Sequence, residues 1–204
     1  MNQRFLAFSA TVLLFTAAAF AQNPITADSP FQVRYAANLD KGDAFVNITN
    51  TGATGGNICV NVYAFSPDEQ LISCCTCPVT PDGLVSLSVR SSLTSNTLTG
   101  VVPPSVVIKL VSTAGGACNA ATASATALAS GLAAWGTSLH ALPLTPGSPA
   151  GTYGVTETAF TPATLSTAEL TRITGLCGFI QTDGSGFGIC KGCALGGLGA
   201  AAAQ

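Results

Sequence analysis

Charge is scarce in this sequence. Charged residues make up 8% of the 204 residues, where about 25% is usual in globular domains. Lysine and arginine form no cluster along the chain, and this argues against nucleic acid as a partner. A nearly neutral surface gives little electrostatic repulsion between copies, so it permits self-association.

Patterns typical of catalysis are also lacking. The only histidine is His140, and the chain has no GxSxG nucleophile elbow, so Ser138 on the same strand face stands without further support. Gly184–Gly188 lacks the Lys-Ser/Thr pair of a phosphate loop. We therefore expect no enzymatic activity, no catalytic residues and no cofactor.

Long apolar runs are confined to the N-terminus. Arg4 precedes the apolar stretch 5–20, and Ala19-Phe20-Ala21 is a small-x-small cleavage sequence. The stretch is shorter than the roughly 20 residues that a membrane-spanning helix needs. We predict a signal peptide over residues 1–21, export to the periplasm or the extracellular space, and no transmembrane segment after cleavage. Without Arg4, six basic and nine acidic residues remain, a net charge of about −3.

Cysteine, by contrast, is plentiful. None of the eight cysteines lies in the predicted signal peptide, and cysteines in an exported protein normally pair. The even count predicts a disulfide framework. Its members are Cys59, Cys74, Cys75, Cys77, Cys118, Cys177, Cys190 and Cys193.

The spacing of some cysteines leaves a metal or thiol-redox protein as an alternative. Cys190 and Cys193 form a CxxC pair, and three more cysteines cluster at 74–77. The CxxC pair precedes a Gly/Ala tail, and Ala194 stands where a haem-attachment motif has histidine. We therefore favour structural disulfides and assign no metal site.

Apolar and polar residues alternate along many short segments, as they do in half-buried strands. A capping box at Ser166–Glu169 then begins one helix, expected over about 167–177. We predict one all-β domain over 22–195, an antiparallel immunoglobulin-like β-sandwich with a short C-terminal helix and a Cys-rich segment. A flexible Gly/Ala-rich tail is expected over 196–204. The expected strands lie within 31–35, 44–49, 58–65, 70–77, 85–90, 106–110, 132–142 and 153–160.

The strands on either side of Ser66-Pro67-Asp68-Glu69 are predicted to form a hairpin through a type I turn. Pairing that is symmetric about this turn sets Phe65 opposite Leu71 and Cys59 opposite Cys77. Cross-strand neighbours approach within disulfide distance, so a direct Cys59–Cys77 bond is expected. A one-residue change of register would remove this match.

Two further cysteine segments are interpreted from their positions. Cys177, at the end of the expected helix, is predicted to bond to Cys190 or Cys193. The segment 114–126 is rich in small residues and contains Cys118, so we interpret it as a loop held by a disulfide.

Aromatic residues give a weak indication of ligand binding. Phe45, Tyr63 and Phe65 are expected on the same side of neighbouring strands, and aromatic platforms bind sugars. The alternative is that this face packs against the second sheet. The polar segment 91–104 is a further candidate for a ligand-binding loop.

Five short pieces of the chain together resemble a family of secreted, uncharacterised bacterial proteins. The similarity extends over most of the mature chain, but the family has no known activity, so it implies no site residues. The first piece alone also resembles a strand-turn of bacterial immunoglobulin-like domains. The pieces are 47–52 (NITNTG), 57–63 (NICVNVY), 74–78 (CCTCP), 177–181 (CGFIQ) and 189–193 (ICKGC).

The sequence thus favours a secreted, non-catalytic structural or adhesive protein of the cell surface or extracellular matrix. Its expected partners are further copies of itself or surface and matrix components. A glycan- or ligand-binding module is the first alternative, and a cysteine-based metal or redox protein is the second.

Overall fold

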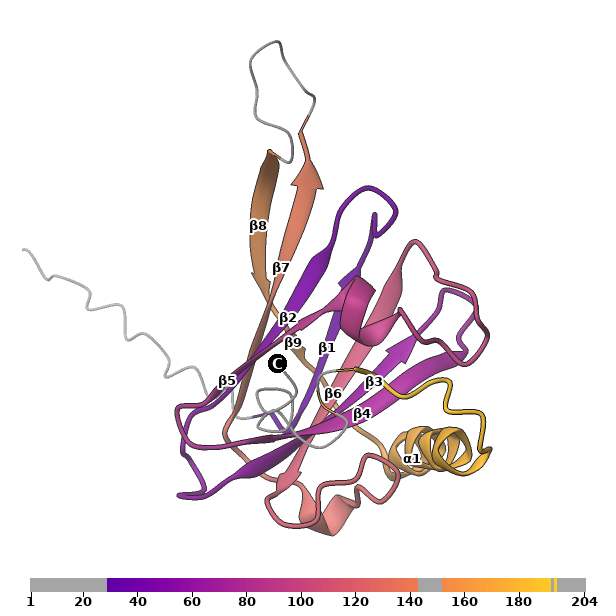
Figure 1. Ribbon diagram of the computed structural model, residues 1–204. Helices are drawn as coiled ribbons and strands as arrows, with labels where there is room; N and C mark the ends of the chain where they lie inside the picture. Colours follow the sequence, from indigo (N-terminus) through magenta and orange to yellow (C-terminus); the bar gives the residue numbers. More distant parts are fainter. Residues whose placement is uncertain (1–28, 143–151, 192, 194–204) are drawn as a thin grey trace, which may run out of the picture.

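The computed structural model describes residues 29–142, 152–191 and 193. The predicted signal peptide and the predicted flexible tail lie outside these residues. The described part contains two antiparallel β-sheets and one α-helix near the C-terminus (Figure 1). The prediction of a β-rich, disulfide-bonded chain with one such helix is confirmed.

The two sheets contain five and four strands. Sheet A has the strand order β4-β3-β6-β1-β9, and sheet B has the order β5-β2-β7-β8. The elements are β1 (Phe31–Ala36), β2 (Ala44–Asn50), β3 (Ile58–Phe65), β4 (Leu71–Val79), β5 (Leu84–Ser88), β6 (Val106–Ala114), β7 (Leu132–Ala141), β8 (Tyr153–Ala159), β9 (Thr161–Pro162) and α1 (Thr167–Thr182). Short helical turns lie at Val89–Leu93 and Ala125–Ala127.

Strand β3, in the middle part of sheet A, is buried on both faces. Every residue of β3 is buried, and successive side chains point to opposite faces of the sheet. Val60 and Val62 join the core between the sheets, whereas Tyr63 and Phe65 join a second core under α1. The near-continuous apolar sequence of β3 follows from this double burial.

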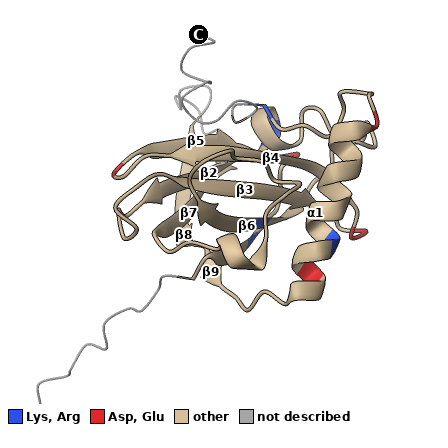
Figure 2. Cartoon of the chain, turned by 90° about the horizontal axis from the view of Figure 1, so that it is seen from below, with Lys and Arg blue, Asp and Glu red and all other residues tan. Residues whose placement is uncertain are grey.

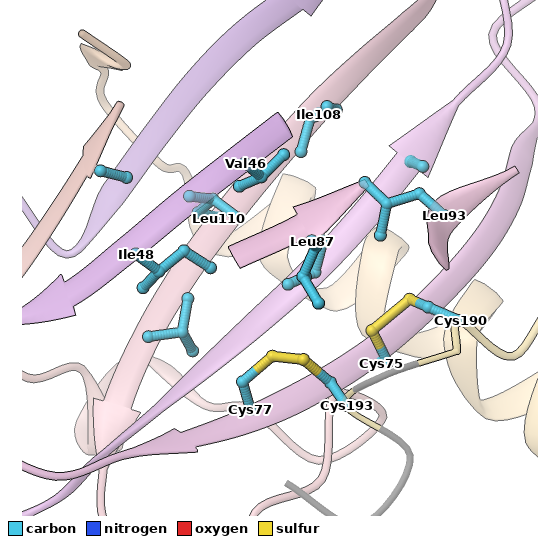
Figure 3. Close-up of a cluster of buried hydrophobic side chains, with 14 of the residues drawn as sticks. Val46, Ile48, Cys75, Cys77, Leu87, Leu93, Ile108, Leu110, Cys190 and Cys193 are labelled. Carbon is cyan, nitrogen blue, oxygen red and sulfur yellow. A yellow bond between two sulfur atoms is a disulfide. The ribbon is translucent and has the colours of Figure 1, made fainter. Parts of the chain in front are cut away.

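The core between the sheets is built from aliphatic side chains of both (Figure 3). Val46 and Ile48 of β2 meet Ile108 and Leu110 of β6 there, and Leu87 of β5 lies beside them. These side chains have no more than 2% of their surface exposed. Removing one of the leucines or isoleucines in favour of alanine would therefore cost about 2–5 kcal/mol.

Helix α1 begins as predicted and ends later. The Ser166 hydroxyl accepts a hydrogen bond from the Glu169 amide at 3.1 Å, which is the expected cap. The helix runs to Thr182, beyond the expected end at Cys177, because Ile180 continues the buried face under which sheet A lies. The contact with the sheet outweighs the low helix propensity of Gly175 and Gly178.

The β3–β4 hairpin contains a β-bulge that the sequence did not reveal. Phe65 faces Leu71 as predicted, but Ala64 faces Ser73, so Ile72 is an extra residue on β4. Beyond the bulge Cys59 faces Pro78, and Cys77 faces Val60. The predicted Cys59–Cys77 bond is therefore wrong, because the one-residue shift sends the two side chains to opposite faces of sheet A.

The edge strands of the two sheets differ in how far other segments of the chain cover them. The C-terminal segment covers the edge of β4, where the Cys74 amide donates to the Gly188 carbonyl at 2.8 Å and the Cys190 amide donates to the Cys74 carbonyl at 3.2 Å. The other edge of sheet A is the two-residue strand β9, which contains Pro162. In sheet B, the seven-residue strand β8 pairs with β7 alone among the described strands.

Candidate functional site

All eight cysteines are disulfide-bonded. This framework indicates that the protein matures in an oxidising compartment outside the cytosol. The prediction that Cys118 holds the 114–126 loop is confirmed, whereas the predicted bond from Cys177 to Cys190 or Cys193 is wrong. The pairs are Cys59–Cys118, Cys74–Cys177, Cys75–Cys190 and Cys77–Cys193.

Three of these bonds start on β4, and we call them the β4 disulfides. Cys74 points under α1 and bonds to Cys177 of that helix. Cys75 and Cys77 point into the core between the sheets and bond to Cys190 and Cys193 (Figure 3). Alternation along one strand thus fastens the helix on one face of sheet A and the C-terminal segment on the other.

The two cysteine motifs identified in the sequence, the cluster at 74–77 and the CxxC pair, form structural disulfides. Both sulfurs of the CxxC pair, Cys190 and Cys193, are bonded to β4 and not to each other, so the pair does not form the internal disulfide of a CxxC redox centre. Neither sulfur is a thiolate that could bind a metal. Within the described ranges, no three His, Cys, Asp or Glu side chains gather as metal ligands would.

The three aromatic residues proposed as a platform do not share a surface. Strands β2 and β3 follow each other in the chain but belong to different sheets. Tyr63 and Phe65 are buried under α1, where the Tyr63 hydroxyl donates to the Ala120 carbonyl at 2.6 Å and burial raises the pKa of Tyr63. Phe45 alone is half-exposed, on sheet B. The predicted platform is therefore wrong for two of its three members.

An ionic cluster lines one open pocket, of about 470 Å³, beside the hairpin turn. Glu169 accepts from the Lys109 ammonium at 2.5 Å and from Arg172 at 2.9 Å through both carboxylate oxygens. The Lys109 nitrogen lies 4.7 Å from the centroid of the Phe65 ring. Glu169 engages both cations, so the cluster joins the start of α1 to β6. Glu69 also lines the pocket, so its two cations are matched by two carboxylates and little net charge is left for a ligand.

The same cluster should make stability depend on acid. Hydrogen bonds from Arg172, and then from Lys109, lower the pKa of Glu169 to about 2. A lowered folded-state pKa adds stability that is present above about pH 4.5 and is lost as the pH falls towards 2. We expect Glu169→Gln to cost about 0.5–1 kcal/mol at pH 7 and almost nothing at pH 2, measured by urea unfolding at both values. An equal cost at the two values would contradict this account.

The predicted loop at 91–104 lines a second open pocket, of about 440 Å³, on the other side of the hairpin turn. Val101 and Val102 are exposed there beside Pro67. Its lining includes Asp68 but neither lysine nor arginine, and it is mostly apolar. This pocket offers apolar contact and little means of selecting a ligand.

Ser138 and His140 lie on the same face of β7, as the alternation predicted. The Ser138 hydroxyl accepts a hydrogen bond from Arg34 at 2.8 Å, and His140 lies at the exposed end of the strand. Ser138 is thus engaged by a buried cation instead of a general base.

The remaining candidate is the outer face of sheet B, the face that points away from sheet A. Its half-buried aromatics, Phe45 and Trp135, belong to neither core. Leu84 and Val155 are 64% and 61% exposed at its two edges. The residues of this face are Phe45, Asn47 and Thr49 of β2, Leu84, Ser86 and Ser88 of β5, Ala133, Trp135, Thr137, Leu139 and Ala141 of β7, and Tyr153, Val155, Glu157 and Ala159 of β8.

A hydrogen-bonded row of polar side chains crosses this face from edge to edge. The Ser86 hydroxyl donates to the side-chain oxygen Oδ1 of Asn47 at 2.8 Å, and the side-chain nitrogen Nδ2 of Asn47 donates to the Thr137 hydroxyl at 3.0 Å. Thr137 in turn donates to Glu157 at 3.0 Å. Each of the four strands contributes one member of this polar row. The alternation of apolar and polar residues predicted that Asn47 points outward and that Trp135 lies on the same side as Leu139. No other sequence pattern indicated the outer face of sheet B.

Comparison with protein-family models, with curated proteins and with solved structures finds no match to this chain. None of the helices in the described ranges is long and apolar enough to cross a membrane. The function must therefore be inferred from the arrangement of the residues themselves.

Proposed function

We propose that this protein is exported, has no catalytic activity and serves as a structural or adhesive protein of the cell surface or extracellular matrix, where it associates with a second copy of itself. The observation that carries the proposal is the contrast between the sheet edges. Sheet A is closed on one side by Gly188–Cys190 with the β4 disulfides and on the other by a short strand with proline. Sheet B leaves β8 open.

Strand β8 has few of the features that protect an edge from pairing. Its seven residues include no proline and no lysine, and Tyr153 and Val155 are 47% and 61% exposed. The paired ends of β7 and β8 also extend beyond the other strands (Figure 1), which leaves this part of the edge accessible. An exposed edge of this kind accepts an added strand through main-chain hydrogen bonds.

Two copies of β8 suit an antiparallel pair related by a two-fold axis. A pair centred on Thr156 sets Val155 opposite Glu157 of the second copy, so like charges do not face each other. Charged residues are few and scattered along the described chain (Figure 2), which keeps the repulsion between copies small.

The proposal extends to the kind of sandwich. In immunoglobulin folds strands B and E pair in one sheet and C and F pair in the other. Here β2 pairs with β5 and β3 pairs with β6, which reproduces that central arrangement. The outer strands differ, since β1 joins β6 and β7 joins β2. We therefore propose an immunoglobulin-like variant in which β1 and β7, the counterparts of strands A and G, exchange sheets.

Self-association is tested by light scattering after size-exclusion chromatography of the mature protein. We expect a dimer, and we expect Val155→Lys to raise its dissociation constant at least tenfold, because lysine on an edge strand opposes pairing. Tyr35→Lys is the matched control, since Tyr35 is 62% exposed on sheet A. A wild-type protein that stays monomeric at the highest attainable concentration, or equal effects of both substitutions, would overturn the proposal.

A further inference from the structure

We propose that the outer face of sheet B binds an extended, neutral, β-1,4-linked polysaccharide chain, with Trp135 and Phe45 stacking against sugar rings and the polar row hydrogen-bonding to hydroxyl groups. This inference goes beyond self-association, because it assigns a ligand to a different surface of the same sheet.

The polar row is oriented before any ligand arrives. Its three hydrogen bonds all run towards the Glu157 carboxylate, which fixes the rotamers of Ser86, Asn47 and Thr137. The second Glu157 oxygen, the second amide hydrogen of Asn47 and the lone pairs of Ser86 remain as acceptors and donors. Sugar hydroxyls both donate and accept, so they match this mixed set, and little side-chain freedom is lost on binding.

The aromatic residues stand beside this row. Trp135 faces Asn47 across β2 and β7, and Phe45 faces Thr137. The two rings therefore occupy one diagonal of a four-residue square, while the two hydrogen-bonded polar residues occupy the other. Neighbouring strands lie about 4.8 Å apart, so each polar group has an aromatic neighbour within reach of the same sugar unit. Aromatic faces pack against the C–H groups of a pyranose while its hydroxyls meet the polar row.

The charge and shape of the face narrow the ligand class. The face includes no lysine or arginine, and its only charge is Glu157, so acidic glycans are disfavoured. Neither of the two pockets beside the hairpin turn is lined by residues of this face. An open sheet surface about 14 Å across its four strands suits a flat chain that lies along it, as β-1,4-linked chains do, more than it suits an enclosed small molecule.

The experiment measures depletion of the mature protein by microcrystalline cellulose and by chitin, at concentrations where the wild type elutes as a monomer. We expect retention on at least one of the two, and at least tenfold weaker retention for Trp135→Ala. Thr137→Val is the second variant, because it keeps the shape of the side chain and interrupts the polar row, and it should also weaken retention. Tyr35→Ala removes an exposed aromatic from sheet A and should leave retention unchanged.

Thermal unfolding of each variant separates lost binding from lost folding, and Thr137→Val is expected to melt within a few degrees of the wild type. Absence of retention on both polysaccharides would overturn the inference. So would wild-type retention by a folded Thr137→Val protein, or an equal loss in Tyr35→Ala. These outcomes leave the result of the light-scattering test unaffected, so the two proposals fail separately.

Discussion

A variant that lacks all three β4 disulfides is expected to be unfolded at 25 °C, whereas variants that lack one of them should stay folded and lose about 2–3 kcal/mol. The reason is that the loops closed by the three bonds overlap almost completely. They leave β4 within four residues and end at Cys177, Cys190 and Cys193, with sequence separations of 103, 115 and 116.

The first of these bonds to form closes a loop of more than 100 residues. By the chain-entropy relation, this stabilises the folded state by about 4.7 kcal/mol. Once that bond exists, each further one closes a loop of only about 5–15 residues and adds about 2–3 kcal/mol. The set contributes about 10 kcal/mol in total, which is as much as the entire stability of a typical domain. Each β4 disulfide therefore already imposes most of the restriction on the unfolded chain that the other two impose.

Urea unfolding of paired Cys→Ala variants measures these costs. The control is the Cys59–Cys118 pair, which closes a separation of 59 residues that the β4 disulfides do not shorten. Its removal alone should cost about 4 kcal/mol, more than the removal of any single β4 disulfide. If removal of a single β4 disulfide proves more costly than removal of Cys59–Cys118, the β4 disulfides act independently and the overlap of their loops does not explain their energetics.

The sequence predicted the hairpin turn but not the register beyond it. Phe65 faces Leu71 as expected, and the bulge at Ile72 then displaces every later pair by one residue. Register is normally specified by one apolar face and one polar face. β3 is buried on both faces, so its side chains satisfy either register equally well. The disulfide partners follow from this choice, and for that reason they were not predictable from local spacing.

The candidate binding face was predictable only in part. Alternation correctly separated outward Asn47 from inward Val46 and Ile48. It does not tell which strands become neighbours, and Asn47 bonds to Thr137, 90 residues away. The assumption that consecutive strands share a sheet also failed, because the chain crosses from sheet B to sheet A between β2 and β3. Long-range pairing depends on how complete sheets bury their apolar faces, which no short stretch of sequence contains.

A second large effect is expected where β7 passes over a buried arginine. A Cβ atom on Gly136 would lie 1.3 Å from Nη1 and 1.9 Å from Cζ of Arg34. The Arg34 side chain, whose residue is 8% exposed, donates to the Phe45 carbonyl at 3.2 Å and to the Ser138 hydroxyl at 2.8 Å. The guanidinium can make room only by breaking these bonds inside the protein. We therefore expect Gly136→Ala to cost about 3 kcal/mol.

Arg34→Met is expected to be nearly neutral alone, since an apolar side chain of similar length replaces a buried cation whose hydrogen bonds go to uncharged oxygens. Combined with Gly136→Ala, it should recover about 2–3 kcal/mol, because the flexible thioether yields to the new methyl group. Urea unfolding of the two single variants and the double variant gives this coupling energy.

Gly175→Ala is the matched glycine control. A Cβ atom at this position of α1 meets nothing within 4 Å, so the substitution should stabilise the protein by about 0.5–1 kcal/mol through helix propensity. A double variant no more stable than Gly136→Ala alone would show that the glycine is required by the backbone of β7. Recovery by Arg34→Met would show instead that Gly136 is there to admit the guanidinium between the sheets.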